Sequence, residues 1–337
     1  MTVFILKRLG LMVLTMLVSS FLVYAVNEFS PGNVASKTLG PYASAEQKQI
    51  LFEKLQLDDP LLVRYFRWLG VLTGIIEDPL ADPELNLGFH DPRGHQYFGN
   101  LGYSTLYKAP VNDIIWDRLG NTLLLAMLAF AIILPLSLVF GVLSGMREGS
   151  ALDRTLSITG ITLTSIPEFA SGVMLVAIFV VWLGWLPGTT PLQELPDWSI
   201  ASQLVLPVMV LVLYDFGYVA RMIRGSMVEV MTRPYIRTAV LKGLPYRRVI
   251  LKHALRNAMI APFTVILLQI NFLITGVVVT EVVFAYPGFG RMLLEAALFG
   301  DITTVEAATI VALFIAVTTQ LIGDIGYMYL NPRIRFT

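Results

Sequence analysis

The uncharged stretch Leu119–Met146 reads LGNTLLLAMLAFAIILPLSLVFGVLSGM and lies between Arg118 and Arg147. About 20 apolar residues in a helix cross the core of a bilayer, so this stretch is long enough to span one. Within it, Gly141 and Gly145 are one turn apart, which favours close packing against a second helix. Of all 337 residues, 55% are hydrophobic and only 14% are charged, against about 25% in soluble domains. With a mean hydropathy of +0.70, we expect an integral membrane protein.

Five further stretches have a similar length and at most one interrupting charge. They are Leu9–Asn27, a segment within Thr155–Gln193 that contains Glu168, Trp198–Ala220 with Asp215, Asn257–Thr280, and Ala307–Pro332 with Asp324. The stretch Leu61–Ile76 contains Arg64 and Arg67, and its charge-free part is too short to span. The first stretch also fits a secretory signal, but its long apolar core favours a retained helix. The sequence thus predicts an all-α integral membrane protein with six transmembrane helices.

The distribution of charge predicts the orientation of these six spans. An even number of spans places both termini on one side, together with residues 147–154 and 221–256. These segments carry a large excess of Lys and Arg, whereas the connections on the opposite side are acidic. Because cytoplasmic loops are enriched in basic residues, we expect cytoplasmic N- and C-termini.

The longest connection, residues 30–118, is predicted to be an extracytoplasmic lobe between spans one and two. Residues 44–55 and 61–69 have helical spacing of apolar side chains. Residues 75–98 are acidic and rich in Pro and Gly, as in a loop. The apolar stripe within 111–119 predicts a short helix along the membrane surface before the second span.

Residues 221–256 are the most distinctive part of the predicted cytoplasmic side, because they are strongly basic yet not of low complexity. Tyr235–Lys242 has the length of a short helix, Gly243 supplies a break, and Pro245 suits the first turn of another helix. Such a segment fits a loop that binds anionic lipid or sets the topology. A helix–glycine–helix pattern also fits docking onto another protein, and the pattern alone leaves both interpretations open.

The run YIRTAVLKG at Tyr235–Gly243, followed by HALRN at His253–Asn257, resembles the EAA-type cytoplasmic loop of ABC importer permeases. Further matches follow in order along the chain, at Ser30–Gly32, Leu57–Pro60, Arg67–Leu69, Leu101–Ser104, Arg118–Leu123, Ser165–Pro167, Glu281–Arg291 and Asn331–Arg335. Together they resemble the B-type transmembrane subunit of the oligopeptide/dipeptide/nickel permease family. The resemblance covers nearly the whole chain and implies the type I ABC importer permease architecture.

The resemblance implies a single transmembrane domain over residues 1–337, multi-pass in the bacterial cytoplasmic (inner) membrane. It implies a solute pathway with no catalytic residue, metal or cofactor in this chain. ATP and Mg would be bound by two partner ABC ATPases, and the sequence has no Gly-x-x-x-x-Gly-Lys-Ser/Thr loop to cradle phosphates. The other implied partners are a homologous second permease, an extracytoplasmic solute-binding protein and the lipid bilayer. No nucleic acid is implied.

Three groups of candidate site residues follow. The resemblance implies an ATPase-coupling role for 221–256 through Arg237, Thr238, Ala239, Lys242, Gly243, Leu244 and Arg247. It implies an outer-gate motif with Glu281, Pro287 and Gly288. Glu168, beside a kink expected at Pro167, and Asp215 are intramembrane acids that would favour a cationic solute if they face the translocation pathway. Internal hydrogen bonding or pairing with a neighbouring subunit explains the two acids at least as well.

The cargo expected from the family is a di- or oligopeptide or a peptide-like solute. Oligosaccharides, opine-like conjugates, glutathione and nickel are alternatives carried by the same kind of machinery. His90 and His95, with Asp91, are weak candidates for metal ligands, because that spacing on a loop is typical of surface histidines.

Two other classes of protein fit part of the sequence. An ion-coupled secondary carrier would explain the intramembrane acids but not the segment 221–256. An intramembrane aspartyl protease would pair Tyr214-Asp215 with Gly323-Asp324. That second motif is incomplete, because residue 321 is leucine where glycine is required.

Overall fold

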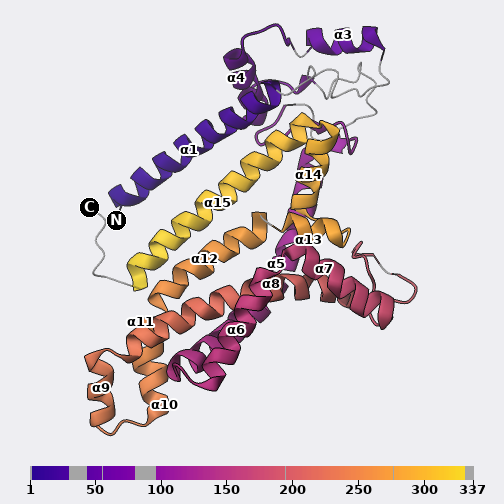
Figure 1. The fold of residues 1–337 in the computed structure, drawn as a ribbon. Coiled ribbons are helices and arrows are strands. Elements are labelled where there is room, and N and C mark those ends of the chain that lie inside the picture. Colours follow the sequence, from indigo (N-terminus) through magenta and orange to yellow (C-terminus); the bar gives the residue numbers. More distant parts are fainter. Residues whose placement is uncertain are drawn as a thin grey trace. The chain divides into compact units, whose positions relative to one another are not determined.

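Figure 1 shows a chain built almost entirely of helices, which confirms the predicted all-α class. The computed structural model describes residues 2–29, 44–54, 56–79, 96–193, 195–275 and 277–330. Several predicted features lie outside the described residues, namely Ser30–Gly32, His90, Asp91, His95 and Asn331–Arg335. The chain divides into two compact units, one from Met1–Gly120 with Phe289–Val317 and the other from Asn121–Gly288 with Thr318–Thr337.

Four helices in the described part of the chain are long and apolar enough to cross a membrane. They lie in α1 (Thr2–Phe29), α5 (Val111–Met146), α8 (Ile200–Met231) and α15 (Ile302–Leu330). Two bent helix pairs have a similar length and composition, and counting each pair as one span gives six. The first, second, fourth and sixth predicted spans therefore correspond to single helices, whereas the third and fifth correspond to the bent pairs.

The third predicted span is broken at Pro167. The helix α6 (Ala151–Ser165) meets α7 (Glu168–Val176) and its π-helical continuation η3 (Ala177–Trp182) at an angle of 93°. Proline has no N–H to donate, and it forces the preceding residue out of helical conformation. Ile166 is accordingly extended, with φ −80° and ψ 125°. The expected kink is thus a complete break, which places Glu168 in the first turn of α7.

The fifth predicted span is divided as well. A helical segment over Tyr246–Ala258 precedes α12 (Ile260–Thr275) at an angle of 58°. That segment comprises α10 (Tyr246–Arg248), the π-helical turn η4 (Val249–Ala254) and α11 (Leu255–Ala258). The short helix α13 (Val278–Val283) follows α12 as a separate element.

Two helix boundaries differ from those expected from the sequence. α5 begins at Val111 and runs to Met146 without a break, so the prediction of a separate surface helix before the second span is wrong. The helical spacing runs unbroken into the span, and Val111 and Ile115 are fully buried. α8 continues to Met231, because no proline or helix-ending turn occurs between Arg221 and Met231. The first part of the segment 221–256 is therefore a continuation of α8.

The first unit joins the lobe that follows α1 to the segment around α14 (Phe289–Phe299). It also contains α3 (Ala45–Lys54), α4 (Leu61–Leu72) and a small hairpin of β1 (Tyr103–Ser104) and β2 (Ala109–Pro110). α4 packs on α1, where the Tyr65 hydroxyl lies 2.8 Å from Ser20 Oγ. Ser104 Oγ donates to Asp301 Oδ2 at 2.5 Å, and the Tyr107 hydroxyl donates to Glu295 Oε2 at 2.8 Å.

The second unit is organised around α8, which packs against α6, α7, α11 and α12. Its inward face is fully buried at Leu206, Leu211, Ile223 and Met227. Small residues allow the helices to approach closely. A Cβ at Gly141 of α5 would lie 2.7 Å from the Ala220 carbonyl oxygen of α8, as the glycine spacing predicts.

Candidate functional site

The segment after α8 forms a short helix, α9 (Pro234–Leu241), that ends in a defined turn. Proline at the first helical position suits the helix start, because its missing N–H would have no partner there. Gly243 has φ +71°, a conformation that residues with a Cβ rarely adopt. Its N–H donates to the Val240 carbonyl at 2.9 Å, and the next N–H, of Leu244, donates to Ala239 at 3.4 Å. This pair of bonds is the Schellman arrangement that ends a helix.

One face of α9 anchors it to the core of the second unit. Ile236 and Ala239 are buried, in a cluster that also contains Val249 and Ile250 of η4. These contacts hold α9 against the helical segment that follows the turn. The α9–turn–η4 segment is therefore a packed element rather than an open loop.

The rest of α9 leaves apolar side chains exposed. Leu241 is 78% exposed and Val240 is 50% exposed. Three basic residues singled out by the sequence, Arg237, Lys242 and Arg247, are exposed as well. We call the exposed residues Tyr235, Arg237, Val240, Leu241, Lys242 and Arg247 the coupling surface, after the role that the sequence resemblance implies for this segment. Of the other candidates, Thr238 is exposed and Leu244 is half-buried.

The candidate outer motif is a compact set of hydrogen bonds. Glu281 is fully buried and accepts a hydrogen bond from Thr122 Oγ1 at 2.5 Å. Asn121 Nδ2 donates to the Pro287 carbonyl at 2.8 Å. A Cβ added at Gly288 would overlap the Glu281 carboxylate, so glycine alone fits there without displacement. These hydrogen bonds connect α13 and the segment after it to Asn121 and Thr122 of α5.

The structure gives the two candidate pathway acids different surroundings. Glu168 Oε1 accepts hydrogen bonds from the N–H and hydroxyl of Thr280, so this carboxylate has partners inside the protein. Asp215 is 1% exposed, and its Oδ1 accepts from Gln269 Nε2 at 2.5 Å. Its Oδ2 has no hydrogen-bond partner among the described residues. Asp215 lines a cavity, and Glu168 is not part of that lining. The side chain of Asp324 lies outside the described side chains.

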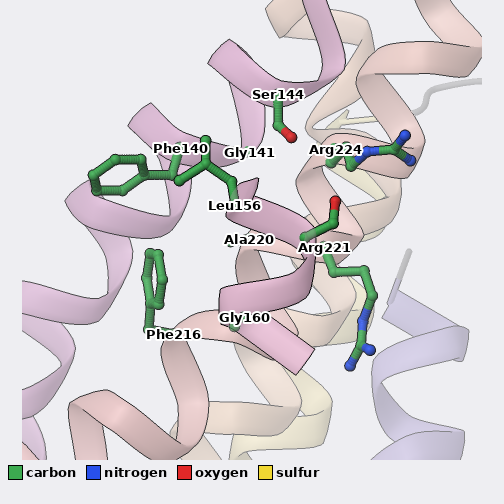
Figure 2. Close-up of a pocket in the computed structure, with 11 residues that line it drawn as sticks. Phe140, Gly141, Ser144, Leu156, Gly160, Phe216, Ala220, Arg221 and Arg224 are labelled. Carbon is green, nitrogen blue, oxygen red and sulfur yellow. The ribbon is translucent and has the colours of Figure 1, made fainter. Parts of the chain in front are cut away.

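An ion pair between α6 and α8 was not predicted from the sequence. Arg224 donates to both carboxylate oxygens of Asp153, from Nε at 2.5 Å and from Nη2 at 2.8 Å. Ser144 Oγ of α5 donates to the same carboxylate at 2.6 Å. Figure 2 shows Ser144 and Arg224 near one another, beside a small cavity that Gly141 and Gly160 also line. The pair joins residues 71 positions apart, and no local motif indicates such a contact.

Comparison with known proteins supports the same class of protein. The family model described as "Binding-protein-dependent transport system inner membrane component" matches residues 137–336. Its N-terminal counterpart, "Binding-prot-dependent transport system membrane comp, N-term", matches residues 1–126. A chain of the MetNI methionine ABC transporter in an inward facing conformation has a TM-score of 0.50 and 18% identity. The match covers 66% of this chain and 96% of that chain, and it shows the fold alone.

Two relatives match over the full length. The oligopeptide transport system permease protein AppB of Bacillus subtilis is 32% identical, over 100% of both chains. The glutathione transport system permease protein GsiC of Salmonella paratyphi A is 32% identical, over 99% of both chains. The fold and these matches define a multi-pass transmembrane permease subunit of an ABC transporter. The chain belongs to the binding-protein-dependent transport system inner membrane component family, and within it to the importer permeases of the peptide/nickel type.

Proposed function

We propose that this chain forms, with a homologous second permease, the translocation pathway of an ATP-driven importer of di- or oligopeptides or peptide-like solutes. Two partner ABC ATPases bind ATP and Mg and hydrolyse the nucleotide, and an extracytoplasmic solute-binding protein delivers the cargo. The complex resides in the bacterial cytoplasmic membrane, with residues 221–256 inside the cell and the lobe over 30–118 outside. The full-length similarity to AppB and GsiC supports a peptide-type cargo, with glutathione itself a tripeptide-like example.

The coupling surface is the observation that carries this proposal. An exposed apolar pair, Val240 and Leu241, belongs to the same short segment as exposed basic residues, a combination typical of a docking site on another protein. Leaving Leu241 78% exposed to water without a partner is unfavourable, since a fully buried leucine gains about 1.5–3 kcal/mol. An acidic-rimmed groove on an ATPase would cover this surface.

The packing of α9 explains how docking transmits force. Because Ile236 and Ala239 lie in the core, α9 cannot move without displacing η4 and the end of α8. The turn at Gly243 fixes the angle between α9 and the following segment through two backbone hydrogen bonds. Movement of an attached ATPase is thus converted into a rigid-body movement of the permease helices, the basis of alternating access.

The substitution Leu241→Asp tests this role. It places a charge at the centre of the coupling surface, so we expect uptake of a labelled dipeptide by the complete transporter to fall at least tenfold. The variant should insert normally, because the side chain makes little contact within this chain. Ile75→Asp is the matched control, since Ile75 is 74% exposed in the other unit. Equal uptake by both variants and the wild type, with the ATPases still bound, would show that the surface does not couple.

A further inference from the structure

A cavity of about 310 Å³ opens within the second unit among α6, α8 and α12. Its lining includes Thr164 of α6, Asp215 and Arg221 of α8, and Gln269 of α12. The volume falls within the range of small-molecule sites, about 300–1,000 Å³. It has room for about ten waters at their liquid density. The cavity is therefore large enough for a short peptide.

One wall of the cavity carries an incompletely paired carboxylate. Gln269 satisfies Oδ1 of Asp215, while Oδ2 has no partner among the described residues although Asp215 is 1% exposed. A buried charge without a hydrogen-bonded partner is costly, so such a group is normally matched by a cation or by donors. This oxygen is itself buried, and a small rotation of the Asp215 side chain would bring it to the cavity that the residue lines, where a bound ammonium group would complete its hydrogen bonding.

A positive charge lies further along the same helix. Arg221 follows Asp215 by six residues, which corresponds to a rise of about 9 Å along α8. Its guanidinium makes no hydrogen bond or ion pair with the described residues. In Figure 2 this side chain extends away from Ser144 and Arg224, so it does not join the ion pair with Asp153. The lining thus presents one acid and one base, separated along one helix.

An aromatic surface completes the lining. The rings of Tyr214 and Phe272 stack with their centroids 5.9 Å apart and an interplanar angle of 24°, and both residues line the cavity. Stacked rings offer a flat apolar face to a side chain. The two charges and the aromatic surface are the groups needed to bind a small zwitterion with an apolar side chain.

We propose that this cavity binds a di- or tripeptide by its two ends, with the ammonium on Asp215, the carboxylate on Arg221 and a side chain against Tyr214 and Phe272. This inference rests on the proposed peptide-import function and names where the cargo lies within this chain. A peptide spans about 3.3–3.6 Å per residue, so two or three residues match the rise of about 9 Å between the charged positions. A neutral sugar would leave both charges without a counter-charge. A metal cation would meet one carboxylate and a positive guanidinium.

The test uses the purified complete transporter in lipid nanodiscs, without nucleotide and without the solute-binding protein. Tritiated Ala-Phe is the probe, and it is displaced by unlabelled Ala-Phe, by N-acetyl-Ala-Phe, which lacks the ammonium, or by Ala-Phe amide, which lacks the carboxylate. In the wild type each modification should weaken binding about tenfold or more, as expected for loss of a hydrogen-bonded charge. Asp215→Asn should abolish the preference for the free ammonium only. Arg221→Gln should abolish the preference for the free carboxylate only.

Two exposed residues supply matched controls. Asp197→Asn and Arg154→Gln make the same chemical changes outside the cavity, and both preferences should persist. A second measurement exploits the absence of cysteine from the chain. Thr164→Cys introduces a single thiol into the lining, and Ala-Phe should slow its alkylation by N-ethylmaleimide severalfold.

The outcomes separate this inference from the function on which it rests. The cavity inference is overturned, and peptide import stands, if the wild type imports Ala-Phe with its binding protein but either of two results is found. One is that Asp215→Asn weakens all three ligands equally, and the other is that Ala-Phe does not protect the thiol of the Thr164→Cys variant. If the wild type neither binds nor imports Ala-Phe, both fall. The assignment is supported if Asp215→Asn loses only the preference for the free ammonium and Arg221→Gln loses only the preference for the free carboxylate.

Discussion

Replacing Gly217 with alanine would insert a methyl group where α8 crosses α6. A Cβ at this position would overlap the backbone of Gly160, and a Cβ at Gly160 would lie 3.3 Å from the Gly217 Cα. Both glycines are buried. Because the obstacle is backbone rather than the end of a flexible side chain, no rotamer change relieves the overlap. The two helices must therefore separate or the pair must lose its packing.

The cost can be isolated by a second glycine on the same helix. A Cβ added at Gly225 would meet no described atom within 4 Å beyond its chain neighbours and the backbone of its own helical turns, so Gly225→Ala should only improve helix propensity, by about 0.5–1 kcal/mol. Gly217→Ala gains the same amount but adds an overpacking cost of about 1–3 kcal/mol. The helix-propensity gain cancels in the comparison. We therefore expect Gly217→Ala to be less stable than Gly225→Ala by about 1–3 kcal/mol.

The measurement is the free energy of unfolding of the purified subunit in mixed detergent micelles, followed by loss of helical circular dichroism. Both variants change the same residue type to the same residue type in one helix, so differences in expression or in detergent binding affect them alike. The close approach of α6 and α8 is refuted if the two variants unfold at the same denaturant concentration and their free energies of unfolding depend equally steeply on that concentration. A stabilised Gly217→Ala would refute it more strongly.

Two further predictions concern charged contacts. Burial raises the pKa of the Glu295 carboxyl, but the hydrogen bonds from Tyr107 and Arg291 together outweigh this effect. The net pKa therefore lies below the ordinary value of 4.5. The contact therefore stabilises the protein fully at pH values above 4.5, and this stabilisation is lost as the pH falls through the lowered pKa. The difference in unfolding free energy between the wild type and Glu295→Gln should shrink under acid. A difference that grows under acid would contradict the contact. Arg224→Gln should lower the free energy of unfolding by about 2 kcal/mol. Adding Asp153→Asn should recover part of this loss in the same unfolding assay, because the carboxylate left without its partner is then removed. Strictly additive losses of the two substitutions would argue against the ion pair.

Much of the fold follows from local sequence signals. Long uncharged stretches identify α1, α5, α8 and α15, because each must satisfy its own backbone hydrogen bonds in lipid. The helix predicted over Tyr235–Lys242 agrees with α9 (Pro234–Leu241) to within one residue at each end, and Gly243, predicted as the break, follows it with a positive φ. Local chemistry decides these features, so one sequence is sufficient to find them.

The remaining features depend on contacts between distant residues. Periodicity cannot show that the kink at Pro167 is a bend of 93°, since that angle depends on the packing of α7 against α8. The Asp153–Arg224 pair likewise joins segments that meet only in the folded chain. Composition identifies Asp215 and Glu168 as unusual intramembrane acids, yet only the structure separates the one that lines a cavity from the one bonded to Thr280.

The course of α8 joins the two proposals mechanically. Asp215 and Arg221 lie on the same helix that ends at Met231, just before α9 begins at Pro234. The proline inside α8, Pro207, precedes Asp215, so no proline kink lies between the cavity and the coupling surface. The segment from Asp215 to Met231 is about 24 Å long and has no proline, so we expect it to move as one rigid element. Under the proposed function, a displacement of α9 by an attached ATPase would therefore tilt the helix that carries both cavity charges. Gly217 packs that helix closely against Gly160 of α6. If the two proposals hold, this contact is the pivot of the tilt, and we expect Gly217→Ala, which widens it, to impair uptake more than it impairs ATP hydrolysis.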